Sequence, residues 1–255
     1  AWFAVDSASF SGERAVTLSI VGDYASEPLA IFDRNGDVSQ RVITDSLVLH
    51  ISGSVTLRDR VRLSATAPVS PWQQGPGGEY NGMQLASPTF AFGDVGVAGD
   101  VRVYGGPRSP LRVALGTRFS LPTGSRTNYT SNGELAVEPR LLVGGSLGPV
   151  EYAAGASAFL RGSNELAGVM FGNELRYQAA LGARFAGGRL LVGPELIGAT
   201  ALQSGTEIGT PLEAQFGAHV RATSHMRFGL AAAAGVINAI GEPTWRALAS
   251  FAWIP

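Results

Sequence analysis

Two short stretches of the chain contain the residue types that enzyme catalysis or metal binding requires. His50 shares one of them with three serines, Ser46, Ser52 and Ser54. Serine catalysis needs such a base beside a hydroxyl nucleophile and a third, orienting group. The other stretch, residues 33–37 (Asp-Arg-Asn-Gly-Asp), spaces oxygen ligands like the start of a calcium loop. It lacks the downstream Glu of that motif, and Asn-Gly is a hairpin-turn signal, so the sequence predicts a turn here and no metal site.

Charged residues elsewhere in the chain alternate with apolar ones. Residues 174–185 read Glu-Leu-Arg-Tyr-Gln-Ala-Ala-Leu-Gly-Ala-Arg-Phe, and every second residue from Leu175 to Phe185 can face lipid. The charged residues, such as Arg176 and Arg184, fall between them. Because successive side chains of a strand point to opposite faces, this segment has one apolar face and one polar face. An apolar outside and a wet inside are the pattern of a transmembrane β-barrel.

The same alternation bears on the catalytic hypothesis. His50 falls on the lumen face of its strand. In outer-membrane barrels of this size that act as lipases, the catalytic groups face lipid instead. We therefore interpret His50, and likewise His219, as histidines that hydrogen-bond within the lumen. The sequence predicts no enzyme, no catalytic residue and no cofactor.

The composition excludes other classes of protein. The chain has 255 residues, a formal net charge of −1 and no cysteine, so nothing indicates attraction to nucleic acid. The longest strongly apolar run, residues 228–241, is shorter than the roughly 20 residues of a spanning helix. It also contains three glycines, which are poor helix residues.

Reading the chain for alternation gives twelve candidate strands. Their ranges are 15–32, 41–57, 61–70, 95–105, 111–122, 135–147, 150–161, 172–186, 189–201, 211–222, 226–237 and 244–254. Connections after even-numbered strands are short, and most of the others are longer, near 33–40, 71–94, 123–134, 162–171, 202–210 and 238–243. Bacterial outer-membrane barrels have an even strand number, short periplasmic turns and longer outside loops. We expect an all-β, single transmembrane antiparallel barrel over residues 15–255, a periplasmic lead-in over residues 1–14, and both termini in the periplasm.

On this register, the lumen receives more basic than acidic side chains. The expected lumen-lining charged residues are Arg62, Asp100, Arg102, Arg112, Arg118, Glu138, Arg140, Glu151, Arg161, Glu174, Arg176, Arg184, Glu195, Glu213, His219, Arg221, Arg227 and Arg246, together with Asp23, His50, Gln178 and Arg189. Trp245, Phe251 and Trp253 face outward on the last strand, and the two tryptophans are spaced to mark the two interfacial aromatic girdles. Charges confined in a narrow bore should pair, because an unpaired buried charge is costly.

Two functional interpretations follow from a charged lumen. If the ion pairs cross-brace the interior, the barrel is closed and structural. If water fills it, the excess of positive charge favours anions. The sequence alone does not separate them, although a closed or very narrow lumen is the favoured interpretation. The long stretch 71–94, rich in Pro, Gly and aromatic residues, is expected to be a constriction, a surface for a partner, or plain decoration.

Several segments in order resemble OmpA-family barrels of the myxobacterial type. The segments that carry this resemblance are residues 3–8, 23–29, 57–63, 67–69, 93–94, 99–103, 120–124 and 241–248. The resemblance implies an N-terminal outer-membrane barrel domain, normally followed by a periplasmic domain that binds peptidoglycan. This sequence stops at Pro255 without such a domain, and an aromatic residue is expected at the end of a barrel that ends its own chain.

Together these observations predict a non-enzymatic, integral barrel of a bacterial outer membrane. The preferred function is the membrane domain of an OmpA-like envelope or anchoring protein with a charged, narrow lumen. The alternatives are a small passive porin-like channel for anionic or polar solutes, and a barrel that partners a surface adhesin or secretion component. Expected partners are outer-membrane lipid and lipopolysaccharide, peptidoglycan through a domain absent here, and a surface protein at the outside loops, with no nucleic acid.

Overall fold

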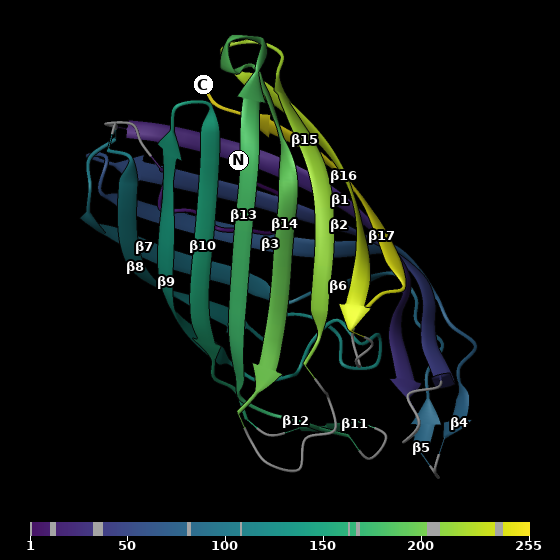
Figure 1. The fold of residues 1–255 in the computed structure, drawn as a ribbon. Coiled ribbons are helices and arrows are strands. Elements are labelled where there is room, and N and C mark those ends of the chain that lie inside the picture. The colour runs from purple at the N-terminus through teal and green to yellow at the C-terminus, as the bar shows by residue number, and fades with distance from the viewer. Residues whose placement is uncertain are drawn as a thin grey trace.

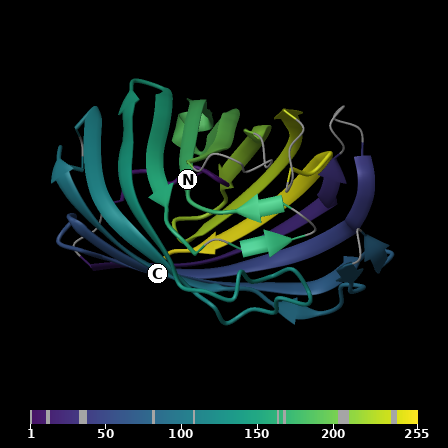
Figure 2. The same ribbon diagram turned by 90° about the horizontal axis from the view of Figure 1, so that it is seen from below.

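Twelve antiparallel strands form a closed barrel in the computed structural model of the chain (Figures 1 and 2). The structure describes residues 2–10, 14–32, 38–80, 83–107, 109–162, 164–166, 169–202, 210–237 and 242–255. The barrel strands are β1 (Arg14–Phe32), β2 (Val38–Leu57), β3 (Val61–Gln74), β7 (Val95–Tyr104), β8 (Leu111–Leu121), β9 (Ala136–Leu147), β10 (Val150–Phe159), β13 (Glu174–Phe185), β14 (Leu190–Ala201), β15 (Leu212–Arg221), β16 (Met226–Ile237) and β17 (Trp245–Trp253).

Each barrel strand pairs with its neighbours in chain order, and β17 pairs with β1 to close the ring. Closure removes the unpaired strand edges that an open sheet would expose, and in lipid every backbone polar group must find its partner within the protein. The fold class predicted from the alternation is therefore confirmed. Among the described residues, no helix has the length and apolar character needed to cross a membrane as a helix.

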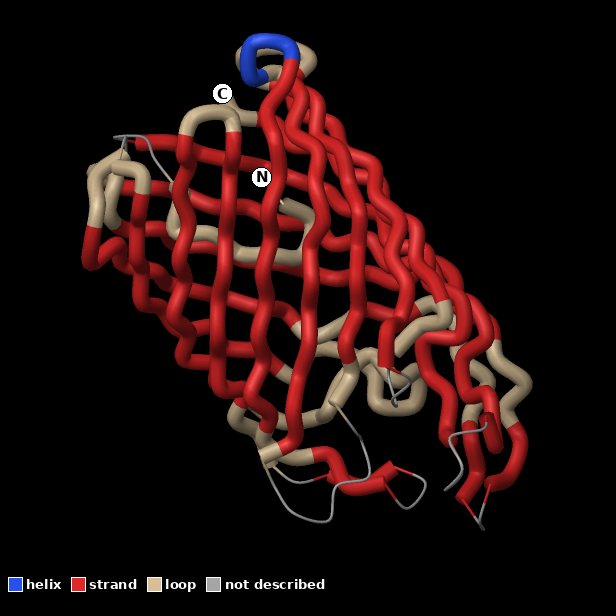
Figure 3. Tube along the Cα trace, in the orientation of Figure 1, coloured by secondary structure: helices blue, strands red, loops and turns tan. Residues whose placement is uncertain are grey.

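The connections differ between the two ends of the barrel. Short turns join β2 to β3, β9 to β10 and β13 to β14, the last through the 3-10 turn η1 (Ala186–Gly188), and they share one end (Figure 3). The C-terminus lies at this end, where the Ile254 N–H donates to the His225 carbonyl at 2.8 Å. We call it the short-turn end, and the opposite one the long-loop end.

The longer connections contain more strand than the sequence indicated. β2 starts at Val38 and β3 runs to Gln74, so residues 38–40 and 71–74 are strand where loop was expected. The error at β3 has a clear cause, because Pro71 lacks an N–H and reads as a strand end. It lies instead beside a bulge, where the pairing of β2 and β3 shifts register between Leu47 and Leu49.

Small strands decorate the long-loop end. β4 (Gly78–Tyr80) pairs with β5 (Met83–Leu85), β6 (Ala91–Phe92) extends the edge of β3, and β11 (Asn164–Leu166) pairs with β12 (Val169–Phe171). Residues 33–37, where the calcium-like spacing occurs, lie outside the described residues. Within the described residues, no group of three or more His, Cys, Asp or Glu is placed to hold a metal ion.

The outer face of the barrel is apolar around its circumference. Leu181 on β13, Phe216 on β15 and Leu230 on β16 are 55%, 61% and 70% exposed. Leu18, Ile51, Leu63, Val101, Leu115 and Leu141 continue this exposed band over β1, β2, β3, β7, β8 and β9. Such a band is far larger than the apolar patches of soluble monomers, and it matches the lipid-facing belt of a membrane barrel.

Aromatic side chains gather at the long-loop end of this face. The ring of Tyr24 lies 5.1 Å from that of Trp245 and 6.3 Å from that of Trp72. Trp253 lies at the other end of β17, where it pairs in register with Met226, and Phe251 packs on Phe228 with 5.3 Å between ring centroids. The assignment of Trp245 and Trp253 to the two membrane interfaces stays a prediction.

The outer and inner faces of the barrel wall should respond differently to charge. Leu181→Arg, at an exposed position in the middle of β13, should lower the free energy of unfolding by about 2–4 kcal/mol, because the guanidinium would enter hydrocarbon. Ser64→Arg on β3, which points into the lumen, is the control and should cost far less. Urea titration of both variants in lipid vesicles measures the difference, and equal losses would contradict the assignment of the faces.

Candidate functional site in the barrel lumen

The inner face carries most of the charged residues that the alternation assigned to the lumen. Asp100 is fully buried and Glu195 is 1% exposed. The other buried charged residues are Arg102, Arg112, Glu138, Arg140, Glu151 and Glu213. Each lies on the face of its strand opposite to the apolar band. The lumen is the candidate functional site because these groups converge there.

The N-terminal segment, residues 2–10, lies inside the barrel. The carboxylate of Glu195 on β14 accepts three of its backbone N–H groups, from Phe3 at 3.0 Å, Ala4 at 3.0 Å and Val5 at 3.2 Å. Gln215 on β15 donates a fourth hydrogen bond, at 3.0 Å. A buried carboxylate is stabilised by donors of this kind, so Glu195 is at once satisfied and the anchor of the segment.

Apolar contacts hold the rest of the segment against the wall. Ala8 and Phe10 pack with Ala114 of β8 and Leu142 of β9. Val5 and Trp2 pack with Ala153 and Ala180 on β10 and β13. Residues 1–14 are expected from the sequence as a periplasmic lead-in before the barrel, but residues 2–10 lie in the lumen and fill part of it. The strand pattern could not reveal this, because the segment itself has no strand periodicity.

Small residues on the inner face of the wall are the one sequence feature that indicates a segment inside the lumen. Small residues occupy inward positions where it passes: a Cβ at Gly144 would lie 2.2 Å from Ser7 Oγ, at Gly182 2.8 Å from the Trp2 ring, and at Gly229 2.7 Å from the Phe3 ring. These glycines therefore make room for a second chain inside the wall. Glycine and alanine at lumen positions of neighbouring strands, where water would permit any polar residue, point to such filling.

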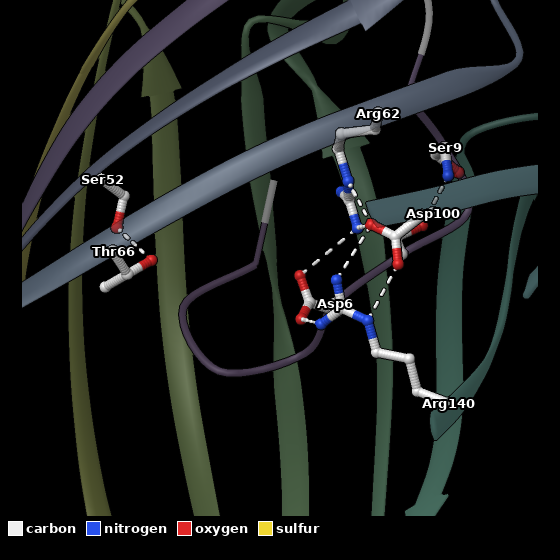
Figure 4. Close-up of polar contacts among 8 residues, drawn as sticks. Asp6, Ser9, Ser52, Arg62, Thr66, Asp100 and Arg140 are labelled. Atoms are coloured by element: carbon white, nitrogen blue, oxygen red, sulfur yellow. Dashed lines mark hydrogen bonds and ion pairs between the residues drawn. The ribbon is translucent and has the colours of Figure 1, made fainter. Parts of the chain in front are cut away.

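Four charged groups alternate in sign where the segment crosses β3, β7 and β9 (Figure 4). Arg140 donates to Asp100 through Nε at 2.8 Å and through Nη2 at 2.9 Å, and through Nη1 to Asp6 at 2.7 Å. Arg62 donates to Asp100 at 2.9 Å, and its Nη2 lies 3.7 Å from Asp6 Oδ1. We call Asp6, Arg62, Asp100 and Arg140 the charge quartet.

A glycine on the intervening strand permits the quartet. Gly116 of β8 pairs with Asp100 on one side and with Arg140 on the other. A Cβ there would lie 2.1 Å from Asp100 Oδ1. Asp100 therefore reaches across β8 to Arg140 only because residue 116 has no side chain.

The structure brings further predicted residues together. Arg246 pairs with Asp23 at 2.7 Å and with Glu213 at 3.1 Å, Arg176 with Glu174 at 3.0 Å, and Arg184 donates through Nε to Glu151 at 2.8 Å. Arg161 also pairs with Glu174, and Glu138 accepts a hydrogen bond from Ser157 at 2.6 Å. Much of the lumen charge is therefore cross-linked between strands.

Other predicted lumen residues find no acid partner. Arg102, Arg112, Arg118, Arg221 and Arg227 make no ion pair with any described residue. Arg102 instead lies over the Phe10 ring, 4.9 Å from its centroid, as Arg62 does on the same ring. His219 stacks on Phe3 with 4.3 Å between ring centroids.

His50 is not arranged for serine catalysis. Its Nε2 lies 3.9 Å from Asp23 Oδ2, and Ser52 instead shares a hydrogen bond of 3.0 Å with Thr66 on β3. No described serine hydrogen-bonds to His50.

The N-terminal segment lies between two cavities. Residues 2–6 line a central cavity of about 530 Å³, and Ser9 lines a second one of about 410 Å³ towards the short-turn end. Hydroxyls form one wall of the central cavity, from Thr17, Ser19, Ser52, Ser54, Ser64 and Thr66. The other wall carries Arg118, Arg140 and Arg176. A polar cavity of this size has room for several water molecules.

Known proteins resemble this chain in fold only. No protein-family model and no curated protein sequence matches the chain. The COG4313 outer membrane channel from Pseudomonas putida F1 superimposes with a TM-score of 0.67 at 13% identity, covering 96% of this chain and 97% of that one. The NanC porin has a TM-score of 0.62 at 10% identity, covering 92% and 98%. The CymD monoaromatic hydrocarbon channel has a TM-score of 0.51 at 8% identity, covering 95% and 88%.

At these identities the likeness establishes the fold and leaves the solute open. The resemblance to OmpA-family barrels is not confirmed by it. The outer-membrane barrel fold and the apolar outer band together identify the protein as an integral barrel of a bacterial outer membrane.

Loss of one carboxylate should unbalance the charge quartet. Asp100→Asn leaves two buried guanidinium groups against Asp6 alone and should lower the free energy of unfolding by about 3–5 kcal/mol. Glu27→Gln, which removes the more exposed pair with Arg41, should cost about 0–1 kcal/mol. Unfolding in urea, followed by the heat-dependent gel shift of the barrel, measures both, and similar losses would show that the quartet contributes little.

The long-loop end contains a titratable group outside the strands. Burial raises the pKa of Glu242 to about 7, nearby Glu213 adds to the rise, and Arg246 opposes it. Since the raised pKa favours the neutral acid in the folded state, this group's contribution to stability is complete below about pH 4.5 and is lost as the pH rises through 7. Glu242→Gln should flatten the stability profile across this window, and an unchanged profile would contradict the assignment.

Proposed function

We propose that the protein is a narrow passive channel for small anionic or polar solutes. The observation that carries the proposal is the central cavity, a polar space inside a closed barrel with more arginines than carboxylates on its wall. Arg62, Arg118, Arg140, Arg176 and Arg246 line it, against Asp6, Asp23 and Glu138. Asp100, Glu174 and Glu213, which lie outside this lining, pair with the other four arginines, so anion selectivity rests on Arg118, which makes no ion pair with a described residue. A positive charge in a confined polar space attracts anions and repels cations.

The two walls suit an anion in different ways. Arg118 has no ion pair among the described residues, so its guanidinium is available to a solute. The facing hydroxyls of β1–β3 both donate and accept hydrogen bonds, so they can follow a solute as it moves. The structural neighbours named above are channels and porins, which supports this assignment and gives no support to an enzyme.

Ion selectivity tests the proposal. The purified, refolded barrel in a planar bilayer under a salt gradient should give steady conductance steps, with a zero-current potential of the sign for anions. Arg118→Gln should move that potential towards zero, because it removes an unpaired lumen charge. Arg126→Gln, at an exposed position near the long-loop end, is the matched control and should leave it unchanged. Silence from folded protein, or selectivity for cations, would overturn the proposal.

The N-terminal segment should limit the size of the conductance. A variant without residues 1–10 should fold and conduct several-fold more than the full chain, because the two cavities would join into one. The heat-dependent gel shift shows whether the truncated barrel folds. A folded variant with unchanged conductance would show that the segment is not the constriction.

The anchoring function implied by the OmpA resemblance is the second candidate. The interstrand ion pairs and the filled lumen favour it, since they suit a barrel whose task is mechanical. Under this proposal the barrel would hold a peptidoglycan-binding partner domain to the membrane, with the short-turn end in the periplasm. The bilayer measurement separates the two candidates, because an anchor requires no conductance.

A further inference from the structure

A second cluster of arginines lies at the short-turn end, away from the central cavity. Its cavity of about 410 Å³ is lined by Arg112, Arg184, Arg189, Arg221 and Arg227, with Glu151, His219 and Ser9. These residues come from β8, β10, β13, β15, β16, the turn before β14 and the N-terminal segment. We call this space the arginine vestibule.

The positive charge of the arginine vestibule is not balanced by the protein. Arg184 is compensated by Glu151, to which its Nε donates at 2.8 Å. Arg112, Arg221 and Arg227 make no ion pair with a described residue. Arg184, Arg189 and Arg221 are exposed to solvent, whereas Arg112 is buried and Arg227 is half-buried. The cost of unbalanced charge therefore falls mainly on Arg112 and Arg227, and a bound anion would relieve it.

Unused hydrogen-bonding atoms surround the same cavity. Arg112 is 8% exposed, and although its Nη1 donates to the Pro107 carbonyl at 3.0 Å, its Nε has no partner. Three other buried atoms, on residues that line the cavity, also lack a partner among the described residues, namely Ser9 Oγ, His219 Nε2 and Arg227 Nε. Buried donors are normally satisfied, because an unmade hydrogen bond in the interior is costly. Their convergence on one cavity indicates a missing acceptor.

We propose that the arginine vestibule binds a phosphate-bearing solute. Arg112 and Arg227 donate hydrogen bonds to the phosphate oxygens, and the Ser9 hydroxyl donates another. Arginine forks match phosphate oxygens in pairs, and a phosphate monoester carries a charge of about −1.5 to −2 at pH 7, which suits this excess of arginines better than a single carboxylate does. The cavity exceeds the size of a phosphate ion, so it has room for a small organic group. Because its lining points into the lumen, the ligand is a soluble compound and not a lipid headgroup.

The inferred phosphate site would give the proposed channel a preferred class of solute. The inference rests on the proposed function only for the route by which the solute reaches the site. A solute that has crossed the central cavity reaches the vestibule beyond the N-terminal segment. Ser9 belongs to that segment, so a bound phosphate would contact both the wall and the segment that divides the lumen.

Isothermal titration of the refolded full-length barrel with inorganic phosphate tests the inference. We expect saturable binding of one phosphate per barrel, with acetate at least tenfold weaker. Arg112→Gln and Arg227→Gln should each weaken phosphate binding at least tenfold, and Ser9→Ala a few-fold. Arg126→Gln, exposed near the long-loop end, is the matched control and should bind as the unmodified chain does.

The outcomes separate this inference from the channel proposal. Absence of saturable phosphate binding, or equal binding by the folded Arg112→Gln and Arg227→Gln variants, would overturn the inference even if the barrel conducts chloride. If Arg112→Gln fails to fold, the Arg227→Gln and Ser9→Ala variants serve instead. Weaker phosphate binding by them supports the inference, and unchanged binding overturns it. If the barrel binds phosphate but carries no current, the inferred phosphate site stands and the proposed channel function is overturned.

Discussion

The structure depends on the need to satisfy charge inside a closed wall. Lipid outside the barrel offers no hydrogen bonds, so the charged side chains in the membrane-spanning part of each strand must turn inward. Twelve strands enclose a lumen too narrow for each of these groups to be fully hydrated, and many of them pair across strands. The charge quartet is the clearest case, because Asp100 is fully buried and both of its oxygens are bound by arginines.

The N-terminal segment is a second consequence of the same constraint. The carboxylate of Glu195 needs donors, and the guanidinium of Arg140 needs an acceptor, that the wall alone supplies only in part. The backbone N–H groups of residues 3–5 and the carboxylate of Asp6 complete these networks. The segment in turn needs space, and inward glycines such as Gly144 and Gly229 provide it. Wall and segment therefore fit each other in both charge and shape.

The division of the lumen gives its two parts different chemistry. The central cavity has mixed charge and many hydroxyls, which suits transient contact with a passing solute. The arginine vestibule has almost no acid and several unsatisfied donors, which suits binding. Both cavities lie inside a fold that is similar to those of channels and porins. In the two proposed roles, a solute would make weak contacts in the central cavity and tighter contacts in the arginine vestibule.

The twelve barrel strands and their faces could be predicted from the sequence, because alternation of apolar and charged residues is a local property that lipid enforces along each membrane-spanning strand. Leu181 and Arg184 could be assigned to opposite faces without any knowledge of their neighbours. It also indicated the excess of positive charge in the lumen.

How those charges pair, and what fills the space between them, could not be predicted from the strands and became apparent in the folded barrel. The reach of Asp100 across Gly116 to Arg140 depends on two strand registers at once, which no single strand encodes. Pro71 was misread because a bulge, and not a strand end, accommodates its missing N–H. The capture of residues 2–10 by Glu195 joins residues about 190 positions apart, and the unpaired arginines of the vestibule become apparent only once their possible partners are placed elsewhere. Such contacts form only when the barrel closes and brings together residues that are far apart in the sequence. The alternation that predicts the strands, by contrast, depends only on residues that are near one another in the sequence.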